Sequence, residues 1–255
     1  MKNPKSILIT GASSGIGEGL ALAYAARGVT LALTGRDRRR LTSVAKACSA
    51  RGAKVLVRQL DVRNAKAVAA FIKAADRKAP LELVIANAGV GVQKEDFKTM
   101  LEAATFTNAV NVVGVFNTVH PAFDAMKKRG RGQVAIMASL AGLIGLPSSP
   151  VYSASKNAVR AYGEALRPLY AAQGIQVNVI CPGWVRSRIT DRNRYSMPFF
   201  MEVDKAVPII VRGLARNKGR IMFPWPLAAM VRLMMLLPIS WASAILGRVT
   251  MRGRA

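Results

Sequence analysis

Acidic residues are scarce in this sequence. Its 255 residues include 13 Asp and Glu against 38 Lys and Arg, which gives a formal net charge of +25. A strong positive charge is typical of proteins that bind nucleic acids or anionic membranes. The Lys and Arg residues are nevertheless spread along the whole chain, with no block of about five or more like charges. We therefore interpret the charge as a surface property of a folded protein.

Cysteine and histidine are almost absent. Cys48, Cys181 and His120 are not spaced as metal ligands are, and this argues against both a disulfide framework and a zinc site. We expect no bound metal and a reducing compartment, the cytoplasm. A strand-like run, Ser6–Thr10, follows Met1–Lys5 directly, so we also expect no signal peptide.

Long hydrophobic runs are lacking as well. The longest uncharged run of the C-terminal segment, 233–247, has 15 residues and contains Pro238, whereas a membrane-spanning helix needs about 20 apolar residues. After Asp204 the chain carries nine Lys or Arg and no acid. We predict an apolar, basic C-terminal helical extension over 224–255 that contacts anionic membranes peripherally. Packing over a substrate pocket or against a second subunit is the alternative.

Hydrophobic residues make up 51% of the chain, which excludes a disordered protein. Short β-branched or apolar runs alternate with longer stretches of helical periodicity. Alternation of this kind predicts an α/β fold with one parallel sheet covered by helices on both faces, which we place in a single domain over 1–223. Expected strands are 7–10, 30–34, 54–60, 83–86, 133–138 and 176–181, and expected helices are 15–27, 37–50, 64–77, 98–128 and 153–172.

A glycine-rich turn follows the first strand. It reads Thr10-Gly-Ala-Ser-Ser-Gly-Ile-Gly17. Gly11 permits a tight turn, Gly15 lets the backbone approach a phosphate, and Gly17 lets the helix pack on the strand. The helix N-terminus then offers N–H groups to a pyrophosphate. A turn without a ligand is the alternative, because short glycine motifs also occur by chance.

With this turn the sequence resembles the short-chain dehydrogenase/reductase family, whose pattern T-G-x-x-x-G-x-G matches residues 10–17. The resemblance covers about residues 5 to 190 and implies a doubly wound sheet of the Rossmann type. It also implies a homodimer or homotetramer formed through the helices that bear Asn111 and Tyr152. The further motifs, in the family's order, are Asp61-Val62, Asn87-Ala88-Gly89, Asn111, Ser139, Tyr152-x-x-x-Lys156 and Pro182-Gly183.

Four of these residues carry the chemistry that the resemblance implies. Tyr152 and Lys156 are four positions apart on a predicted helix, so both lie on one face, and the ammonium favours the phenolate. Tyr152 would exchange a proton with the substrate oxygen while a hydride moves to or from the nicotinamide. Lys156 would bind the ribose, Ser139 would bond the substrate oxygen, and Asn111 would hold a water that links Lys156 to solvent. The alternatives are a solvated helix pair for Tyr152 and Lys156 and a strand-end cap for Ser139.

The end of the second strand favours NADP(H) over NAD(H). Gly35 stands where NAD enzymes of the family have an acid, and Arg36 suits a 2′-phosphate. Asp37 could bind the ribose of NAD instead, but it precedes a predicted helix and fits an N-cap better. The residues predicted to bind the cofactor are Gly11, Ser13, Ser14, Gly15, Ile16, Gly17, Arg36, Asp61, Val62, Asn87, Ala88, Gly89, Tyr152, Lys156, Pro182, Gly183, Val185 and Ser187.

The predicted substrate loop, 190–202, is apolar and aromatic and includes Tyr195. Together with Gly91 and Val92 it favours a small lipophilic carbonyl or alcohol as substrate. Rival hypotheses are a nucleic-acid-binding protein and a cofactor sensor without catalysis, both on the same scaffold. No nucleic-acid recognition motif accompanies the charge, and the four chemical residues are intact. We therefore predict an NADP(H)-dependent oxidoreductase with no nucleic-acid partner.

Overall fold

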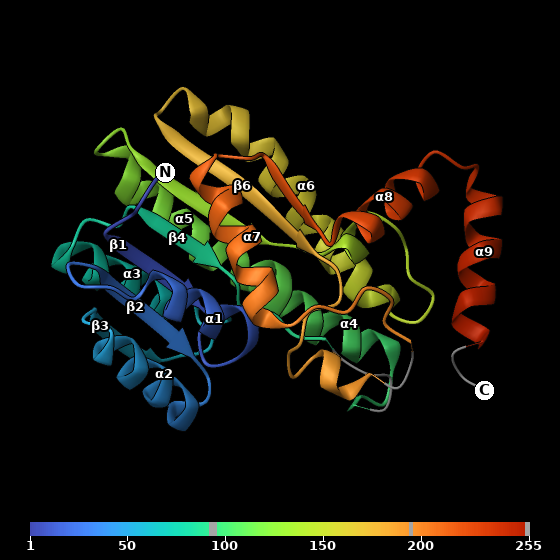
Figure 1. The fold of residues 1–255 in the computed structure, drawn as a ribbon, viewed down its shortest axis with the longest axis horizontal. Coiled ribbons are helices and arrows are strands. Elements are labelled where there is room, and N and C mark those ends of the chain that lie inside the picture. Colours follow the sequence, from blue (N-terminus) through green and yellow to red (C-terminus); the bar gives the residue numbers. More distant parts are fainter. Residues whose placement is uncertain (92–95, 194–195, 253–255) are drawn as a thin grey trace.

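The computed structural model describes residues 1–91, 96–193 and 196–252. Its centre is a sheet of seven strands in the order β3-β2-β1-β4-β5-β6-β7, and every pairing is parallel (Figure 1). The predicted doubly wound sheet is therefore confirmed. The strands are β1 (Ser6–Thr10), β2 (Thr30–Gly35), β3 (Lys54–Gln59), β4 (Leu83–Ala86), β5 (Gly132–Met137), β6 (Ile175–Pro182) and β7 (Arg220–Phe223).

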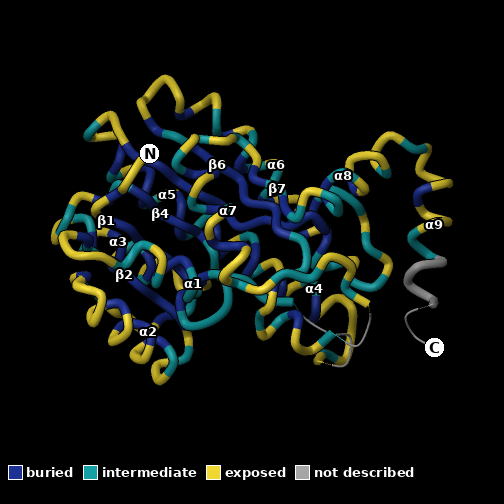
Figure 2. Tube along the Cα trace, in the orientation of Figure 1, coloured by how far each residue is buried: buried dark blue, intermediate teal, exposed yellow. Residues whose placement is uncertain are grey.

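Helices cover both faces because each central strand is apolar on both sides. In β1, Ile7 and Ile9 join one buried cluster while Leu8 joins the other, as the alternation of strand side chains requires. Figure 2 shows the resulting band of buried residues along the sheet. The helices α1 (Gly15–Tyr24), α2 (Arg38–Ala50) and α7 (Val203–Ala215) pack into one cluster, and α3 (Ala65–Lys78), α5 (Gly114–Lys127) and α6 (Pro150–Ala171) into the other.

Three elements differ from the sequence prediction, and one of them is α7, which was not among the expected helices. The single helix expected over 98–128 is α4 (Met100–Asn108), a π-helical turn over Ala109–Val113, and then α5. Strand β7 was not predicted, because four residues between a loop and Pro224 carry too little alternation to be recognised.

The C-terminal extension forms two helices, α8 (Trp225–Met234) and α9 (Ile239–Arg252). Ala228 and Val231 of α8 are buried in the cluster that also holds α5 and α6. Helix α9 lies at the end of the molecule, beyond α8 (Figure 1). Within the described residues, no helix combines the length and apolar character needed to cross a membrane.

The strand order reverses between β1 and β4. Successive crossovers leave this point in opposite directions, and parallel sheets of this kind bind ligands in the crevice that such a reversal leaves at the carboxyl edge. The glycine-rich turn follows β1 and Asn87 follows β4, so the fold brings two separately predicted motifs to the same place.

Candidate active site

The glycine-rich turn is held in a conformation that few other residues could adopt. Gly11 has a φ of +66°, and a Cβ there would lie 2.8 Å from the Cα of Ala88. A Cβ on Gly17 would overlap the carbonyl oxygen of Gly11 and approach the Asn87 amide nitrogen. Glycine is therefore required at both positions for the turn, α1 and the end of β4 to meet.

The N-terminus of α1 is open to an anion. Helices α2 and α3 have their first N–H groups capped by Asp37 and Asn64, whereas the side chain of Ser14 makes no capping hydrogen bond to α1. The uncapped N–H groups and the positive end of the helix dipole together suit a phosphate.

Hydrogen bonds fasten the end of β4 to this turn. The hydroxyl of Thr10 accepts the backbone N–H groups of Asn87 and Ala88, each at 3.1 Å. The side-chain amide of Asn87 in turn donates to the carbonyl oxygens of Thr10 at 3.0 Å and Gly11 at 3.2 Å. Asn87 thus acts as a brace between the two strands at the switch point.

The end of β2 presents an unshielded cation. Arg36 is exposed, and its neighbour Asp37 accepts the N–H of Arg40 at 2.9 Å and forms an ion pair with the same residue. The predicted N-cap role of Asp37 is therefore confirmed. A Cβ on Gly35 would lie 2.9 Å from the Ser13 hydroxyl, so the Ser13 side chain fits here because position 35 has no side chain.

At the end of β3, Asp61 is bound to Arg63. The guanidinium donates to both carboxylate oxygens, at distances down to 2.7 Å, and this hydrogen bonding lowers the pKa of Asp61. Val62 is buried and packs against Gly114 at the start of α5. Asp61, which was predicted to bind the cofactor, thus lies beside Arg63, which sequence reasoning did not single out.

Helix α6 carries Tyr152 and Lys156 on one face, as their spacing predicts. Lys156 is only 3% exposed, its ammonium donates to the carbonyl of Met137 at 2.9 Å, and it lies 5.7 Å from the centre of the Tyr152 ring. Burial lowers the pKa of Lys156 to about 8. The alternative of a solvated helix pair is therefore wrong for Lys156.

Ser139 lies where the ends of β5 and β6 meet. Its hydroxyl accepts the N–H of Ala141 at 3.1 Å and donates to the carbonyl of Pro182 at 3.3 Å. The first of these bonds caps the short 3₁₀ turn Leu140–Gly142, so the strand-end cap considered for Ser139 does exist. The hydroxyl proton is held by a long bond, which leaves it free to turn toward another acceptor.

Asn111 lies in the π-helical turn and is fully buried. Its side-chain oxygen accepts the N–H of Val90 at 2.8 Å, while its amide nitrogen donates to the Val90 carbonyl and to the Ser155 hydroxyl, each at 3.0 Å. Ser155 is fully buried and donates to the carbonyl of Tyr152 at 2.8 Å. Sequence reasoning missed Ser155; a Ser three residues after Tyr152 on a helix can bond back to its carbonyl, which was the available signal.

The loop after β6 closes the site on the side of the turn. Gly183 donates to Phe223 at 2.7 Å, and buried Val185 forms a bridge with Met201. Ser187 faces Gly15 and donates its N–H to the Thr190 hydroxyl at 2.8 Å. Thr190 is buried and was not anticipated as an organising residue. The predicted substrate residues Val92 and Tyr195 lie outside the described residues.

Contacts therefore connect the predicted residues into one site at the carboxyl edge of the sheet. Gly89 lies at its centre: a Cβ there would lie 3.2 Å from both the Asn111 oxygen and the Lys156 nitrogen. Glycine keeps this approach to the ammonium open. The arrangement combines an anion-binding turn, a buried cation, a phenol and a hydroxyl around a single crevice, which is a set suited to binding a phosphorylated cofactor and moving a proton.

Comparisons with known proteins agree with this geometry. The family model described as short chain dehydrogenase matches residues 5–197. An uncharacterized oxidoreductase of Myxococcus xanthus is 38% identical over 235 residues, which is 92% of this chain and 93% of the relative. A short-chain dehydrogenase from Sphingobium yanoikuyae in complex with NADPH superposes with a TM-score of 0.78 at 26% identity, covering 91% of this chain and 96% of that one. A short chain dehydrogenase/reductase from Burkholderia phymatum in complex with NAD gives 0.81 at 26% identity, covering 90% and 92%. The chain belongs to the short-chain dehydrogenase family and is an oxidoreductase.

Proposed function

We propose that this oxidoreductase interconverts a carbonyl and a secondary alcohol on a lipophilic substrate and uses NADP(H). The observation that carries the proposal is the buried ammonium of Lys156 beside the ring of Tyr152, next to an uncapped helix N-terminus. A buried cation next to a phenol lowers the free energy of the phenolate, and this suits Tyr152 to donate and accept a proton.

The cofactor fits the crevice for reasons of space and charge. Gly11, Gly17 and Gly89 leave backbone and ammonium accessible where any side chain would intrude, and α1 offers uncapped N–H groups to the pyrophosphate. When bound, the nicotinamide supplies or accepts the hydride. Lys156 would hold the ribose hydroxyls, and the loop of Val185 and Ser187 would cover the nicotinamide end.

Three side chains then act on the substrate oxygen or on the proton that it exchanges. Ser139 turns its hydroxyl from Pro182 to the oxygen and orients it. Tyr152 donates the proton during reduction and takes it back during oxidation. Lys156 stabilises the phenolate that forms, and its buried position strengthens this interaction because little water screens it.

Asn111 and Ser155 position the helix that bears Tyr152. The chain of bonds from Val90 through Asn111 and Ser155 ends on the Tyr152 carbonyl and ties α6 to the loop after β4. The side-chain amide of Asn111 is already used by these hydrogen bonds. We therefore propose that the backbone of the π-helical turn, and not the Asn111 side chain, holds the water that links Lys156 to solvent.

The preference for NADP(H) rests on the end of β2. Arg36 is exposed and Asp37 is committed to its cap, so a 2′-phosphate would meet a guanidinium and the Ser13 hydroxyl. The structural neighbours include both an NADPH complex and an NAD complex, so the argument for NADP(H) depends on these residues.

Apolar groups around the crevice support a lipophilic substrate. Ile189 packs against Gly91, and Phe199 is 48% exposed in the loop over the site. A homodimer or homotetramer through α4 and α6 is supported by the exposed apolar side chains of Met100 and Leu101 on α4. A reducing cytoplasm is consistent with the unpaired thiols of Cys48 and Cys181.

The first prediction concerns Tyr152. Tyr152→Phe should keep NADPH binding and lose about 10² to 10⁴-fold in kcat, because only the transferable proton is removed. Tyr162→Phe on the same helix removes a hydroxyl that bonds His120 and should leave kcat unchanged. Fluorescence titration of NADPH and turnover over a panel of apolar ketones measure the two effects. Near-normal turnover by Tyr152→Phe would exclude this residue as the acid.

The second prediction concerns the cofactor. Arg36→Ala should weaken NADPH binding about ten- to a hundredfold and leave NADH binding unchanged, because one charge-assisted contact is lost. Arg38→Ala, on the neighbouring turn, is the control. The triple change Ser13→Gly, Gly35→Asp and Arg36→Ile should reverse the preference, since removing the Ser13 side chain makes room for the carboxylate. Tighter binding of NADH than of NADPH by the unmodified protein contradicts this assignment.

The third prediction concerns the charge on Lys156. Its pKa is about 8 in the native protein against 10.5 for a free lysine, so between these values the unfolded chain binds more protons than the native protein. The free energy of unfolding should therefore rise with pH in this window, by up to about 3 kcal/mol relative to Lys156→Met. Urea denaturation of both proteins at several pH values from 7 to about 10.5 measures the difference. Parallel pH profiles would mean that the pKa of Lys156 is the same in the native and the unfolded protein.

A further inference from the structure

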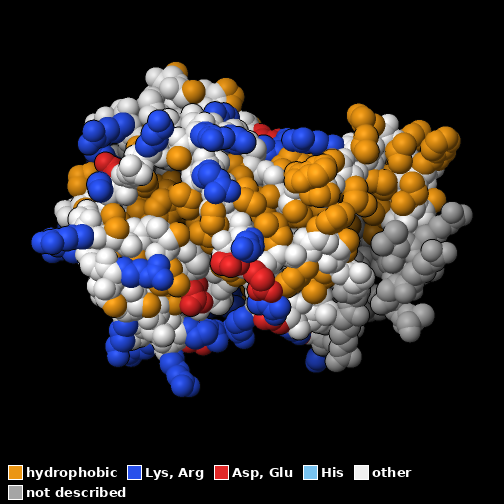
Figure 3. All heavy atoms as spheres, viewed as in Figure 1, with side chains coloured by type: hydrophobic (Ala, Val, Ile, Leu, Met, Phe, Trp, Pro, Cys, Tyr) orange, Lys and Arg blue, Asp and Glu red, His pale blue; other side chains and the backbone are white. Residues whose placement is uncertain are grey.

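The C-terminal helices expose a continuous set of large apolar side chains. Trp225, Leu236 and Ile239 are each about four-fifths exposed, and Leu233 and Trp241 are 65% exposed. Figure 3 shows the hydrophobic side chains gathered over α8 and α9 at one end of the molecule. Ala228 and Val231, on the opposite side of α8, are buried in the core. The fold thus anchors α8 by one face and presents its other face outward.

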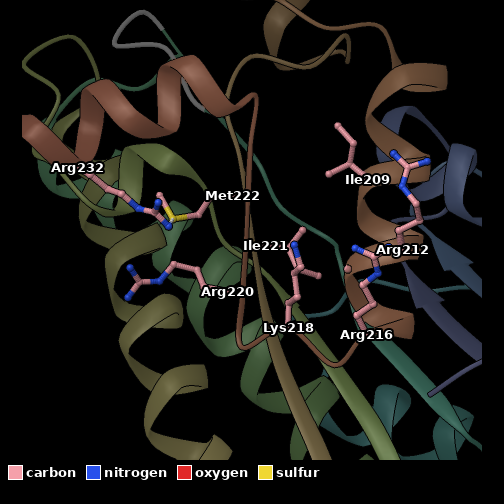
Figure 4. A pocket seen from close by; sticks show the side chains of 9 residues that line it. Ile209, Arg212, Arg216, Lys218, Arg220, Ile221, Met222 and Arg232 are labelled. Atoms are coloured by element: carbon pink, nitrogen blue, oxygen red, sulfur yellow. Dashed lines mark hydrogen bonds between the residues drawn. The ribbon is translucent and has the colours of Figure 1, made fainter.

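A cationic hollow lies next to these helices. It has a volume of about 230 Å³, and none of the residues that line it belongs to the predicted site around Tyr152. Figure 4 shows the lining side chains, which come from α7, β7, α8 and the segment between α7 and β7. No acidic side chain lines it, and Arg220 is the lining residue that is paired, with Glu164 at 2.6 Å. Among the described residues, the other cations of the hollow form no ion pair. The cations that line it are Arg212, Arg216, Lys218, Arg220 and Arg232.

Arg232 joins the hollow to the apolar face. It lies on α8 seven residues, or two helical turns, after Trp225, so the two project from the same side of this helix. Leu236 follows in the turn directly after α8. Figure 4 shows its side chain directed toward Met222 at the hollow, and the two are in contact at 3.5 Å. The hollow therefore opens at the rim of the apolar face.

We propose that this combined surface, α8–α9 with the cationic hollow, binds an anionic lipid bilayer peripherally. The apolar side chains would enter the boundary between headgroups and acyl chains, and the hollow would receive a lipid phosphate. The absence of any acid after Asp204 in the sequence matches the charge of such a surface. The proposal is independent of the catalytic assignment, because no residue of the Tyr152 site takes part.

Charge favours a lipid surface over the other occupants. Two copies meeting through this face would bring two cationic hollows together, and this local repulsion opposes association there. A soluble phosphate would use the hollow but leave the adjoining apolar face exposed to water, which is unfavourable for a patch of this size.

Flotation of the full-length protein with vesicles tests the proposal. We expect binding to vesicles of phosphatidylcholine mixed with phosphatidylglycerol, loss of binding at high salt, and little binding to phosphatidylcholine alone. Arg212→Glu with Arg216→Glu should weaken binding by at least about 25-fold. Lys66→Glu with Lys73→Glu, on α3, changes the net charge equally and should weaken binding less than about threefold. Trp225→Ser with Leu236→Ser should weaken binding at least about tenfold.

Several outcomes overturn the proposal. Equal loss in the α7 and α3 variants would mean that net charge alone drives binding. Binding of soluble tripolyphosphate without flotation would assign the hollow to a free phosphate ligand. An oligomer that dissociates with Trp225→Ser and Leu236→Ser, in a protein that does not float, would assign the face to a second copy. Thermal melts followed by circular dichroism, together with NADPH titration, show that each variant remains folded.

Discussion

The hydrogen bonds between Thr10 and the end of β4 are the contacts on which the rest of the site depends. The Thr10 hydroxyl accepts two consecutive N–H groups, and Asn87 returns two bonds to the turn. Because the strand order reverses here, no helix crossover connects the loops after β1 and β4 directly. These short polar contacts therefore decide how closely the phosphate-binding turn approaches the groups that follow β4, including Gly89 and the ammonium beside it.

Of the side chains in this site, Lys156 is the one whose burial costs the most free energy. An ammonium loses its hydration when it is buried, and the lowered pKa measures that cost. The carbonyl of Met137 offsets part of it, and Gly89 leaves the space beside it open. Asn111 and Ser155 then hold α6 in register with the loop after β4. Among the described residues, no carboxylate forms an ion pair with the Lys156 ammonium, so this charge remains available to stabilise a phenolate. We therefore infer that the free energy lost by burying Lys156 serves the proposed function.

The centre of the sheet and its β7 side carry different groups of residues. The carboxyl edge near β1 and β4 carries the glycine-rich turn and the residues that we propose as acid–base groups. The β7 side carries the cationic hollow and the apolar face of α8, neither of which includes a residue of the proposed catalytic site. A lipophilic substrate and a lipid-binding surface on one chain would fit together, since a substrate dissolved in a bilayer could be reached without crossing water. Each of the two proposals rests on its own set of contacts.

Sequence alone determined the features that depend on local pattern. Alternating apolar runs were enough for the parallel sheet, and the glycine spacing and the four-residue interval of Tyr152 and Lys156 were enough for the turn and the shared helix face. Only the tertiary structure decided the contacts between distant segments, such as those of Ser155 with Asn111 and of Ser13 with Gly35. It also brought α7, β7 and α8 together around one cationic hollow. Periodicity reports which face of an element is apolar, but burial, pKa and charge clustering arise from packing between elements, which no local pattern specifies.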